Sequence, residues 1–383
     1  MSDALIYLDN NATTAVAPEC IAAMTASLRD FYGNPSSKHA SGEAAKSQTL
    51  AARAQVAALL GASPAEIVFT SGGTEAIHQA ILGALALAPG KRRMVTSQVE
   101  HPATLLLLEH LASSQDLDVV YLPVDKDGRL DLAELDSAIT ADTALVSLMW
   151  ANNETGVLFP IAEAAALAAA KGVLIHSDAV QAAGKLPIDL KQVPLDFLSL
   201  SGHKLHGPKG VGALFVRKGR KIPPLLFGHQ ERGRRGSTEN VPGIVGLGVA
   251  AELAAAGLQT DEAQVAGLRD RLESGLLAAL PGSSITGAGA PRLAGTSSLN
   301  LGGIEAEIVL DKLDKAGVCA SAGAACSAGG TEASHVLLAM GLTAEAALST
   351  IRFSLGRYNT AAEIDRVIRL LPSIVQTALA EAA

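Results

Sequence analysis

The chain has 383 residues, with 30 Lys or Arg against 38 Asp or Glu, so its formal net charge is −8. Hydrophobic residues make up 49% of the chain, which excludes global disorder and provides enough apolar surface for a sizeable core. The acidic balance argues against a general binder of nucleic acid or anionic membranes, so neither is an expected partner.

Strand and helix signals alternate through the first part of the chain. Short apolar runs typical of buried strands occur at 66–70, 94–97, 118–122, 144–149, 173–176, 196–200 and 211–216. Most are separated by segments long enough for a crossover helix, such as the Ala-rich segment 161–171. This order predicts an α/β fold with a mostly parallel sheet, and the short loop between the last two strands allows them to pair antiparallel.

The pattern changes after about Val241. We predict a long helix over 261–280, followed by strands at 298–301, 318–320 and 351–355 and helices at 305–316 and 361–382. These elements indicate a smaller α+β domain. We therefore expect a large domain over 16–258 and a small C-terminal domain over 259–383. The N-terminal segment 1–15 is expected to join the small domain.

The cysteine content predicts a protein of a reducing compartment. The three cysteines, Cys20, Cys319 and Cys326, are too few for a disulfide framework. The sequence has no Cys-x-x-Cys pair, which argues against a four-ligand zinc site. The N-terminus has no basic segment before an apolar run, and no uncharged apolar stretch approaches the ~18–20 residues of a membrane helix. We expect a cytoplasmic protein in which Cys20 and Cys319 are small buried apolar residues.

Lys204 is a candidate for covalent catalysis. It lies in the segment SGHKLHGPKG, directly after the apolar run DFLSL, so the end of a strand presents it next to glycine. A lysine in such a place can form a Schiff base with an aldehyde cofactor that acts as an electron sink. Taken alone, the segment is also compatible with a solvated loop lysine, which is the commoner case.

Three further segments lie at the ends of predicted strands. In TSGGTE, Gly73 and Thr74 begin a helical stretch whose free N–H groups can bind phosphate, although a simple capped helix start explains the segment equally well. In HSDAVQ, Asp178 can pair with a protonated pyridine nitrogen or cap the following segment. His101, in QVEHPAT, can stack on a ring or move protons, but a lone histidine is more often structural.

Cys326 differs from the other cysteines. It lies in the run SAGAACSAGG, which has no large apolar residue to bury it, so we expect a thiol on a mobile arm. Arg352, in IRFS, can clamp a carboxylate or form a surface ion pair. The segment 230–239 (QERGRRGSTE) is either a solvated loop or an anion-binding segment at an interface.

In their order and amino-acid sequence, these segments closely resemble those of the cysteine desulfurases of the NifS/IscS type. These are pyridoxal-phosphate enzymes of the class V aminotransferase group. The resemblance extends from about Tyr7 to Arg357. It rests on YLDNNATT, YGNPSSKH, TSGGTEA, VEHPA, NNETGV, HSDAVQAAGK, SGHKLHGPKGVGALFVRKG, QERGRR, STENVPG and SHVLLAMG. It implies fold type I, with a seven-stranded mostly parallel sheet in the large domain, a small C-terminal domain, and a homodimer with a shared active site.

The resemblance also implies catalytic roles. Lys204 would hold pyridoxal 5'-phosphate as a Schiff base and then remove the Cα proton of L-cysteine. Asp178 would pair with the pyridine nitrogen, and His101 would stack on the ring and shuttle protons. Cys326 would attack the substrate sulfur, so that L-alanine leaves and a persulfide remains on Cys326.

Further contacts are implied for the cofactor and the substrate. Gln181 would bond the phenolic oxygen, and Asn153 and Arg352 would bind the substrate carboxylate. The phosphate would be held by Gly73, Thr74, Ser201 and His203, together with Thr238 of the partner subunit. No permanent metal is implied, although Cys326 could serve as a transient iron–sulfur ligand shared with a scaffold.

The persulfide would pass to a sulfur-acceptor protein such as an iron–sulfur scaffold. The long stretch between Cys326 and Ser334 resembles the long-loop group of the family, which favours delivery to a scaffold. Ser237 stands where the family usually has glycine, and Gly228-His229 replaces a longer glycine run. Two alternatives remain: another class V enzyme, such as an aminotransferase or a selenocysteine or cystine lyase, and a non-catalytic sulfur carrier that retains the fold.

Overall fold

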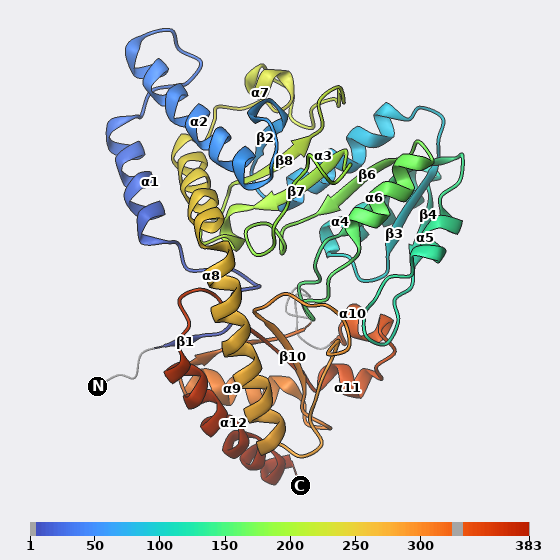
Figure 1. The fold of residues 1–383 in the computed structure, drawn as a ribbon, viewed down its shortest axis with the longest axis vertical. Coiled ribbons are helices and arrows are strands. Elements are labelled where there is room, and N and C mark those ends of the chain that lie inside the picture. The colour runs from blue at the N-terminus through green and yellow to red at the C-terminus, as the bar shows by residue number, and fades with distance from the viewer. Residues whose placement is uncertain (1–4, 324–331, 383) are drawn as a thin grey trace.

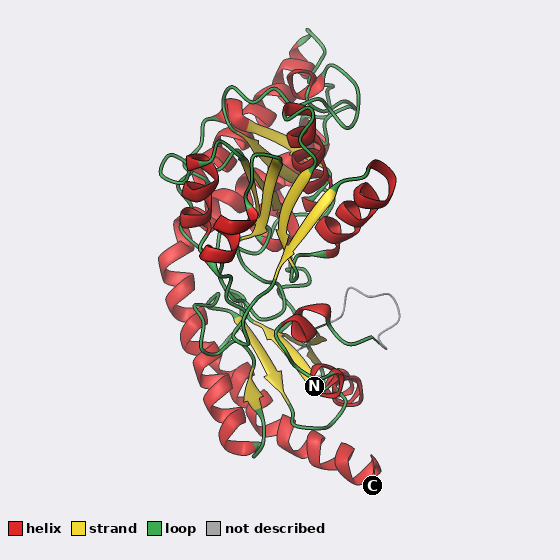
Figure 2. Cartoon of the chain, turned by 90° about the vertical axis from the view of Figure 1, so that its right-hand side faces the viewer, coloured by secondary structure: helices red, strands yellow, loops and turns green. Residues whose placement is uncertain are grey.

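A computed structural model of the chain describes residues 5–323 and 332–382, which form a large lobe above a small one (Figure 1). Figure 2 shows the central sheet of the large lobe enclosed by helices and the small sheet of the lower lobe backed by helices. Helix α8 (Val241–Ala279) runs through both lobes and connects them. The lobes meet along the middle of this helix, where the candidate site described below also lies.

The large lobe contains a seven-stranded sheet in the order β2-β8-β7-β6-β5-β3-β4. Every neighbouring pair is parallel except the two that involve β8, which is antiparallel to β2 and β7. The strands are β2 (Ile67–Thr70), β3 (Arg93–Ser97), β4 (Asp118–Leu122), β5 (Thr143–Met149), β6 (Leu174–Asp178), β7 (Phe197–Ser201) and β8 (Gly212–Val216). The predicted mostly parallel sheet and its antiparallel last pair are confirmed.

Helices cover both faces of this sheet because its inner strands are apolar on both sides. Val68, Met94 and Phe197 belong to a core cluster with α3 (Gly73–Leu87) and α4 (Pro102–Gln115). The residues that follow them in each strand, such as Phe69, point to the other face. That face packs against α2 (Ala40–Leu59), α6 (Ile161–Ala170) and the first half of α8.

The large lobe contains further helical elements. They are α1 (Pro18–Asp30), η1 (Pro64–Glu66), α5 (Leu132–Ala138), η2 (Gly202–Lys204) and α7 (Gln230–Gly233). Helices α1 and α2 pack against α8. This packing places an apolar segment of α8 in the interior of the large lobe.

The small lobe is built on a four-stranded antiparallel sheet in the order β12-β13-β10-β9. Its strands are β9 (Ser284–Ile285), β10 (Thr296–Asn300), β12 (Ser321–Ala322) and β13 (Thr350–Ser354). Its helices are α9 (Ala306–Lys315), α10 (His335–Ala339), α11 (Ala344–Leu348) and α12 (Ala361–Ala382). A separate apolar cluster centred on Leu299, Ile351 and Phe353 packs between the sheet, α9, α12 and the second half of α8.

The N-terminal segment belongs to the small lobe before it enters the site. Strand β1 (Ile6–Tyr7) pairs in parallel with β11 (Val318–Cys319), and Ile6 and Leu8 are part of the small-lobe core. Asp9 then forms a bridge with Ser354. The residues that follow, from Asn10 to Thr14, therefore lie between the two lobes.

Most predicted elements agree with the structure within two residues, and β4 and α12 have the predicted bounds. The predicted start of the long helix was wrong, since α8 begins at Val241 rather than near Asp261. The predicted domain boundary at 258/259 falls inside this helix and stays a prediction.

In the described part of the chain, α8 is the one helix long and apolar enough to cross a membrane, and 56% of its most apolar window is buried inside the protein. Such burial is typical of a core helix.

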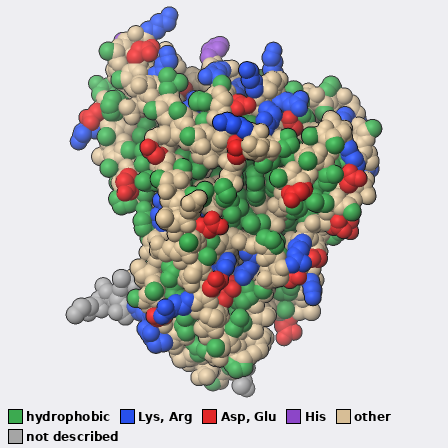
Figure 3. Space-filling model, viewed as in Figure 1, with side chains coloured by type: hydrophobic (Ala, Val, Ile, Leu, Met, Phe, Trp, Pro, Cys, Tyr) green, Lys and Arg blue, Asp and Glu red, His purple; other side chains and the backbone are tan. Residues whose placement is uncertain are grey.

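On the face seen in Figure 3, charged side chains are scattered rather than gathered in one patch.

Candidate active site

A cavity of about 300 Å³ lies at the carboxyl ends of β6 and β7. Open α/β sheets bind ligands at this edge. Ten of the predicted site residues line it: Gly73, Thr74, His101, Asn153, Asp178, Gln181, Ser201, His203, Lys204 and Arg352. The structure thus brings together residues that are up to 279 positions apart in the chain, with Asn11 and Ala12 closing one side.

Lys204 ends the short helical turn η2 that follows β7, and its amine points into the cavity. Its Nζ donates to the carbonyl oxygens of Asn11, at 2.5 Å, and Ala12, at 2.7 Å. The neighbouring Thr14 bonds to the carbonyl oxygen of His203 through both its N–H and its hydroxyl. The N-terminal segment therefore sets the position of the lysine.

Asp178 is the last residue of β6 and is buried. Its Oδ1 accepts a hydrogen bond of 2.9 Å from the N–H of Val180. Burial raises the pKa of Asp178 to about 6, although this hydrogen bond and the charge of Lys204 oppose the rise. A cationic group of a ligand placed beside this carboxylate would restore its ionised form.

His101 is the N-cap of α4, where its Nδ1 accepts a 3.0 Å hydrogen bond from Ala103 N–H. Burial lowers the pKa of His101 to about 4, and the charges of Lys204 and His335 add to the effect. The ring is therefore neutral at pH 7. Because Nδ1 is the acceptor, the proton sits on Nε2.

One end of the cavity is suited to an anion. Helix α3 begins at Gly73, and its N-cap Gly72 offers no side chain to the first N–H groups. A Cβ atom at Gly73 would lie 2.8 Å from Val180 Cγ2, so glycine is needed for the close approach of the helix start to β6. Thr74, Ser201 and His203 surround this end.

Arg352 lies at the opposite side, in β13, and is almost completely buried. Its Nη2 bonds to Asp9 Oδ1 at 2.8 Å, and its Nη1 donates to the carbonyl oxygen of Asn153 at 3.1 Å. Its Nε has no hydrogen-bond partner among the described residues. A ligand carboxylate that bonded to Nε would satisfy this buried donor.

Sequence reasoning missed two residues beside Lys204. The carbonyl oxygen of Asn11 accepts hydrogen bonds from both Lys204 Nζ and Gln181 Nε2. Lys185 Nζ bonds to the side-chain oxygens of Asn11 and Gln181. Both residues lie in segments quoted for the family resemblance, YLDNNATT and HSDAVQAAGK. The amino-acid sequences of these segments were therefore the signal by which the two residues could have been found.

Two buried glutamates behind the cavity were also missed. Glu100 Oε1 accepts from the hydroxyl of Ser97, at 2.6 Å, and the N–H of Met149, at 3.0 Å. Burial raises the pKa of Glu100 to about 8 and that of Glu154 to about 7. Both residues adjoin predicted site residues, His101 and Asn153, and lie in the segments VEHPA and NNETGV quoted for the family resemblance.

Two predicted site residues are not among the ten named above. Thr238 is exposed and is not among the lining residues, and Cys326 lies outside the described residues. Of the other cysteines, Cys20 is buried as expected, but Cys319 is only partly buried, so that expectation was wrong. The described residues contain no group of three or more His, Cys, Asp or Glu arranged to hold a metal ion.

Comparison with known proteins agrees with this architecture. The model of the family described as aminotransferase class-V matches residues 6–367. "Cysteine desulfurase 2" of Trichormus variabilis is 53% identical over 373 residues, which cover 97% of this chain and 93% of the relative. A solved structure titled "NIFS-like protein" superimposes with a TM-score of 0.91 at 38% identity, covering 97% of this chain and all of the other. "SspA in complex with cysteine" does so with a TM-score of 0.81 at 34% identity, covering 93% and 100% of the two chains.

Proposed function

The chain belongs to the aminotransferase class-V family, and on that premise we propose that it is a pyridoxal-phosphate-dependent cysteine desulfurase, a sulfurtransferase that converts L-cysteine to L-alanine. The observation that carries the proposal is that Lys204 and Asp178 line one cavity together with His101. The 53% identity to a cysteine desulfurase and the likeness to a structure with bound cysteine support this reaction over others of the family.

The cavity residues fit pyridoxal phosphate. They offer an amine for covalent attachment at Lys204, a buried carboxylate at Asp178 for the ring nitrogen, and uncapped N–H groups at Gly73 for the phosphate. When bound, the cofactor supplies an aldehyde carbon that captures amines and a ring that withdraws electrons from neighbouring bonds.

The burial of Asp178 favours a positively charged ligand group. A carboxylate in this position is costly unless a cation accompanies it, as the raised pKa of Asp178 indicates. A protonated ring nitrogen would supply that cation, and the ion pair would keep the nitrogen charged. The neutral imidazole of His101 would stack on the ring and present its Nε2–H.

Lys204 would move protons at its Nζ. The carbonyl oxygens of Asn11 and Ala12 hold this nitrogen at the cavity wall, so it stays close when a substrate amine takes its place. A neutral amine there can accept the proton from the substrate Cα. His101 would relay a proton in the same space.

The carboxylate of L-cysteine would bind between Arg352 and Asn153. Arg352 keeps its ion pair with Asp9 and offers Nε, which has no partner among the described residues. The Asn153 side chain lines the cavity beside it. These contacts would orient the Cα–H bond toward Lys204 and the thiol toward the cavity mouth.

Cys326, outside the described residues, would take the sulfur. Its thiolate would form an S–S bond with the substrate sulfur as the Cβ–S bond breaks, and the Cβ then gains a proton to give L-alanine. The sulfur atom is transferred without any external oxidant. We propose that the persulfide passes to an acceptor protein such as an iron–sulfur scaffold.

The active site would be completed in a homodimer. Thr238 is exposed on this chain, in the segment between α7 and α8. The resemblance to the family assigns the contact with the phosphate to Thr238 of the partner subunit. This contact would make the active site a shared one.

The test combines absorbance with sulfur release. Addition of pyridoxal phosphate to the wild-type protein should produce an absorbance band that borohydride removes, with the cofactor then fixed on the Lys204 peptide. Lys204→Ala should lack the band. Cys326→Ser should keep the band but lose transfer of sulfur from L-cysteine, whereas Cys319→Ser should keep both.

The outcomes separate the alternatives. Undiminished sulfur release by Cys326→Ser would indicate another enzyme of the family, such as an aminotransferase or a selenocysteine or cystine lyase. A wild-type protein that binds no pyridoxal phosphate would instead indicate a non-catalytic sulfur carrier.

A further inference from the structure

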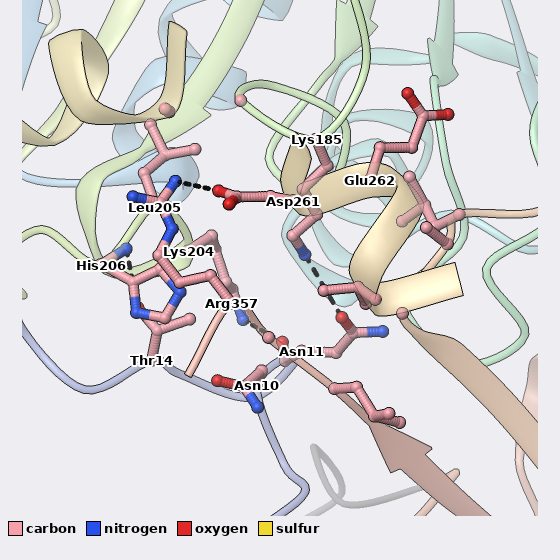
Figure 4. A pocket seen from close by; sticks show the side chains of 18 of the residues that line it. Asn10, Asn11, Thr14, Lys185, Lys204, Leu205, His206, Asp261, Glu262 and Arg357 are labelled. Atoms are coloured by element: carbon pink, nitrogen blue, oxygen red, sulfur yellow. Dashed lines mark hydrogen bonds and ion pairs between the residues drawn. The ribbon is translucent and has the colours of Figure 1, made fainter. Parts of the chain in front are cut away.

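A second lysine, Lys185, lies in a pocket that adjoins the cofactor cavity. Lys185 Nζ donates to Gln181 Oε1 at 3.0 Å and to Asn11 Oδ1 at 3.3 Å, both of which are neutral amide oxygens. Figure 4 shows Lys185 reaching Asn11 in an adjoining pocket that Lys204 also lines. The proposed reaction makes no use of this lysine.

Lys185 fixes the orientation of a side chain that faces the cofactor cavity. An ammonium group has only donors, so the amide oxygen of Gln181 must face Lys185 and the amide nitrogen must point away from it. Gln181 Nε2 accordingly donates to the carbonyl oxygen of Asn11, at 3.0 Å. The amide oxygen is therefore occupied by Lys185, and one N–H of Nε2 is left for the cofactor cavity, which Gln181 lines.

Asn11 connects this amide to the catalytic amine. The same carbonyl oxygen that accepts from Gln181 accepts from Lys204 Nζ at 2.5 Å. The Asn11 side chain in turn donates to the carbonyl oxygen of Asn153, at 3.1 Å, and to Thr296 Oγ1, at 2.9 Å. Lys185 thus contacts the residue on which the position of Lys204 depends.

The charge of Lys185 acts on Lys204 as well. Burial lowers the pKa of Lys185 to about 7, and repulsion by Lys204 and Arg352 adds to the effect. Electrostatic repulsion between two groups is reciprocal, so the Lys185 ammonium disfavours a second ammonium at Lys204. The charge of Lys185 also affects His203. The other charged or titratable groups in the adjoining pocket are His206, Asp261, Glu262 and Arg357. Asp261 and Arg357 form an ion pair at 2.9 Å.

We propose that Lys185 is a positioning residue, which turns the remaining N–H of Gln181 toward the cofactor and favours the neutral form of the Lys204 amine. This inference rests on the proposed binding of pyridoxal phosphate at Lys204. It assigns a role to a residue that touches neither the cofactor cavity nor the substrate.

The charge role is tested with Lys185→Met and Lys185→Gln in the cofactor-loaded protein without substrate. The readout is the pH midpoint of the absorbance change of the bound cofactor. Removing a nearby cation favours the protonated nitrogen on Lys204, so both variants should raise the midpoint by about one pH unit. Lys191→Met, which changes an exposed lysine, should leave it unchanged.

The orientation role is tested with the same pair of variants. Both lack the charge, but Lys185→Gln keeps a donor toward Gln181 and Asn11, which also guards against misfolding of the apolar variant. Cofactor should dissociate about tenfold faster from Lys185→Met than from Lys185→Gln, as expected for the loss of one buried hydrogen bond. Equal dissociation rates would overturn this role.

A wild-type midpoint in either neutral variant would overturn the charge role while leaving the proposed function intact. A wild-type protein that gains no absorbance band with pyridoxal phosphate would overturn the proposed function, and this inference with it.

Discussion

Ser334 donates a hydrogen bond of 2.5 Å to Glu154 Oε2, across 180 positions of the chain. Both residues are buried, and Glu154 follows Asn153 in the cavity wall. A Cβ atom at Gly323 would lie 2.5 Å from the same carboxylate oxygen. Glu154 therefore lies against Gly323 and Ser334, which precede and follow the segment that contains Cys326.

Replacing Glu154 by Ala should impair sulfur transfer more than cofactor binding. The change leaves the buried hydroxyl of Ser334 without this acceptor, which costs about 1–3 kcal/mol, and releases both ends of the segment. We expect persulfide formation on Cys326, followed by mass spectrometry, to slow between about tenfold and 10²-fold. The cofactor absorbance should be unchanged, and Glu345→Ala, which alters an exposed glutamate, is the control. A parallel loss of cofactor would contradict this prediction.

Glu100 should make the protein less stable as pH rises. Its pKa is raised from 4.5 in the unfolded chain to about 8 in the folded state. Between these values the folded protein retains a proton that the unfolded chain releases, so stability falls as pH increases through that window.

Replacing Glu100 by Gln imitates the neutral acid and should remove this contribution. Relative to the wild type, Glu100→Gln should gain up to about 4 kcal/mol between pH 5 and pH 9, measured by denaturant unfolding at each pH. A constant difference between the two proteins over this range would show that Glu100 does not titrate there.

The buried ion pair between Arg53 and Glu231 should be costly to break. Arg53 bonds to both carboxylate oxygens of Glu231, at 2.6 and 2.5 Å, and Phe69 N–H donates to the same carboxylate. Arg53→Met would leave the carboxylate buried without its cation and should lower the free energy of unfolding by about 3–5 kcal/mol.

A second substitution tests the reason for that loss. Arg53→Met combined with Glu231→Gln removes both charges and should recover much of the stability. Arg29→Met, which breaks an exposed ion pair with Asp30, should cost less than about 1 kcal/mol. If the double variant were no more stable than Arg53→Met, the unpaired charge would not be the cause.

Ser237 occupies a backbone conformation that favours glycine. Its φ is 87°, in the left-handed region, which accounts for the glycine that the family usually has here. Ser237→Gly should relieve about 1 kcal/mol of strain, partly offset by greater freedom of the unfolded chain. We expect a rise in melting temperature of about 1–2 °C by calorimetry. Ser63→Gly, where φ is −85°, should give no gain.

Periodicity in the sequence was sufficient to predict most of the fold. Strand β4 and helix α12 have the predicted bounds because their apolar patterns and the residues that end them are local. The first half of α8 was missed because its segment is glycine-rich and apolar on all sides, which weakens a helical signal. It is helical because α1, α2 and the central sheet bury it.

The site residues, too, were only partly predictable from the sequence. Residue type and position after a strand were enough to single out Lys204 and Asp178, since the carboxyl ends of parallel strands share one edge of a sheet. No local pattern brings Lys185 to Asn11, 174 positions away, or Ser334 to Glu154. Those contacts, and the raised or lowered pKa values that accompany them, depend on burial and on the packing of one lobe against the other, which only the folded chain determines.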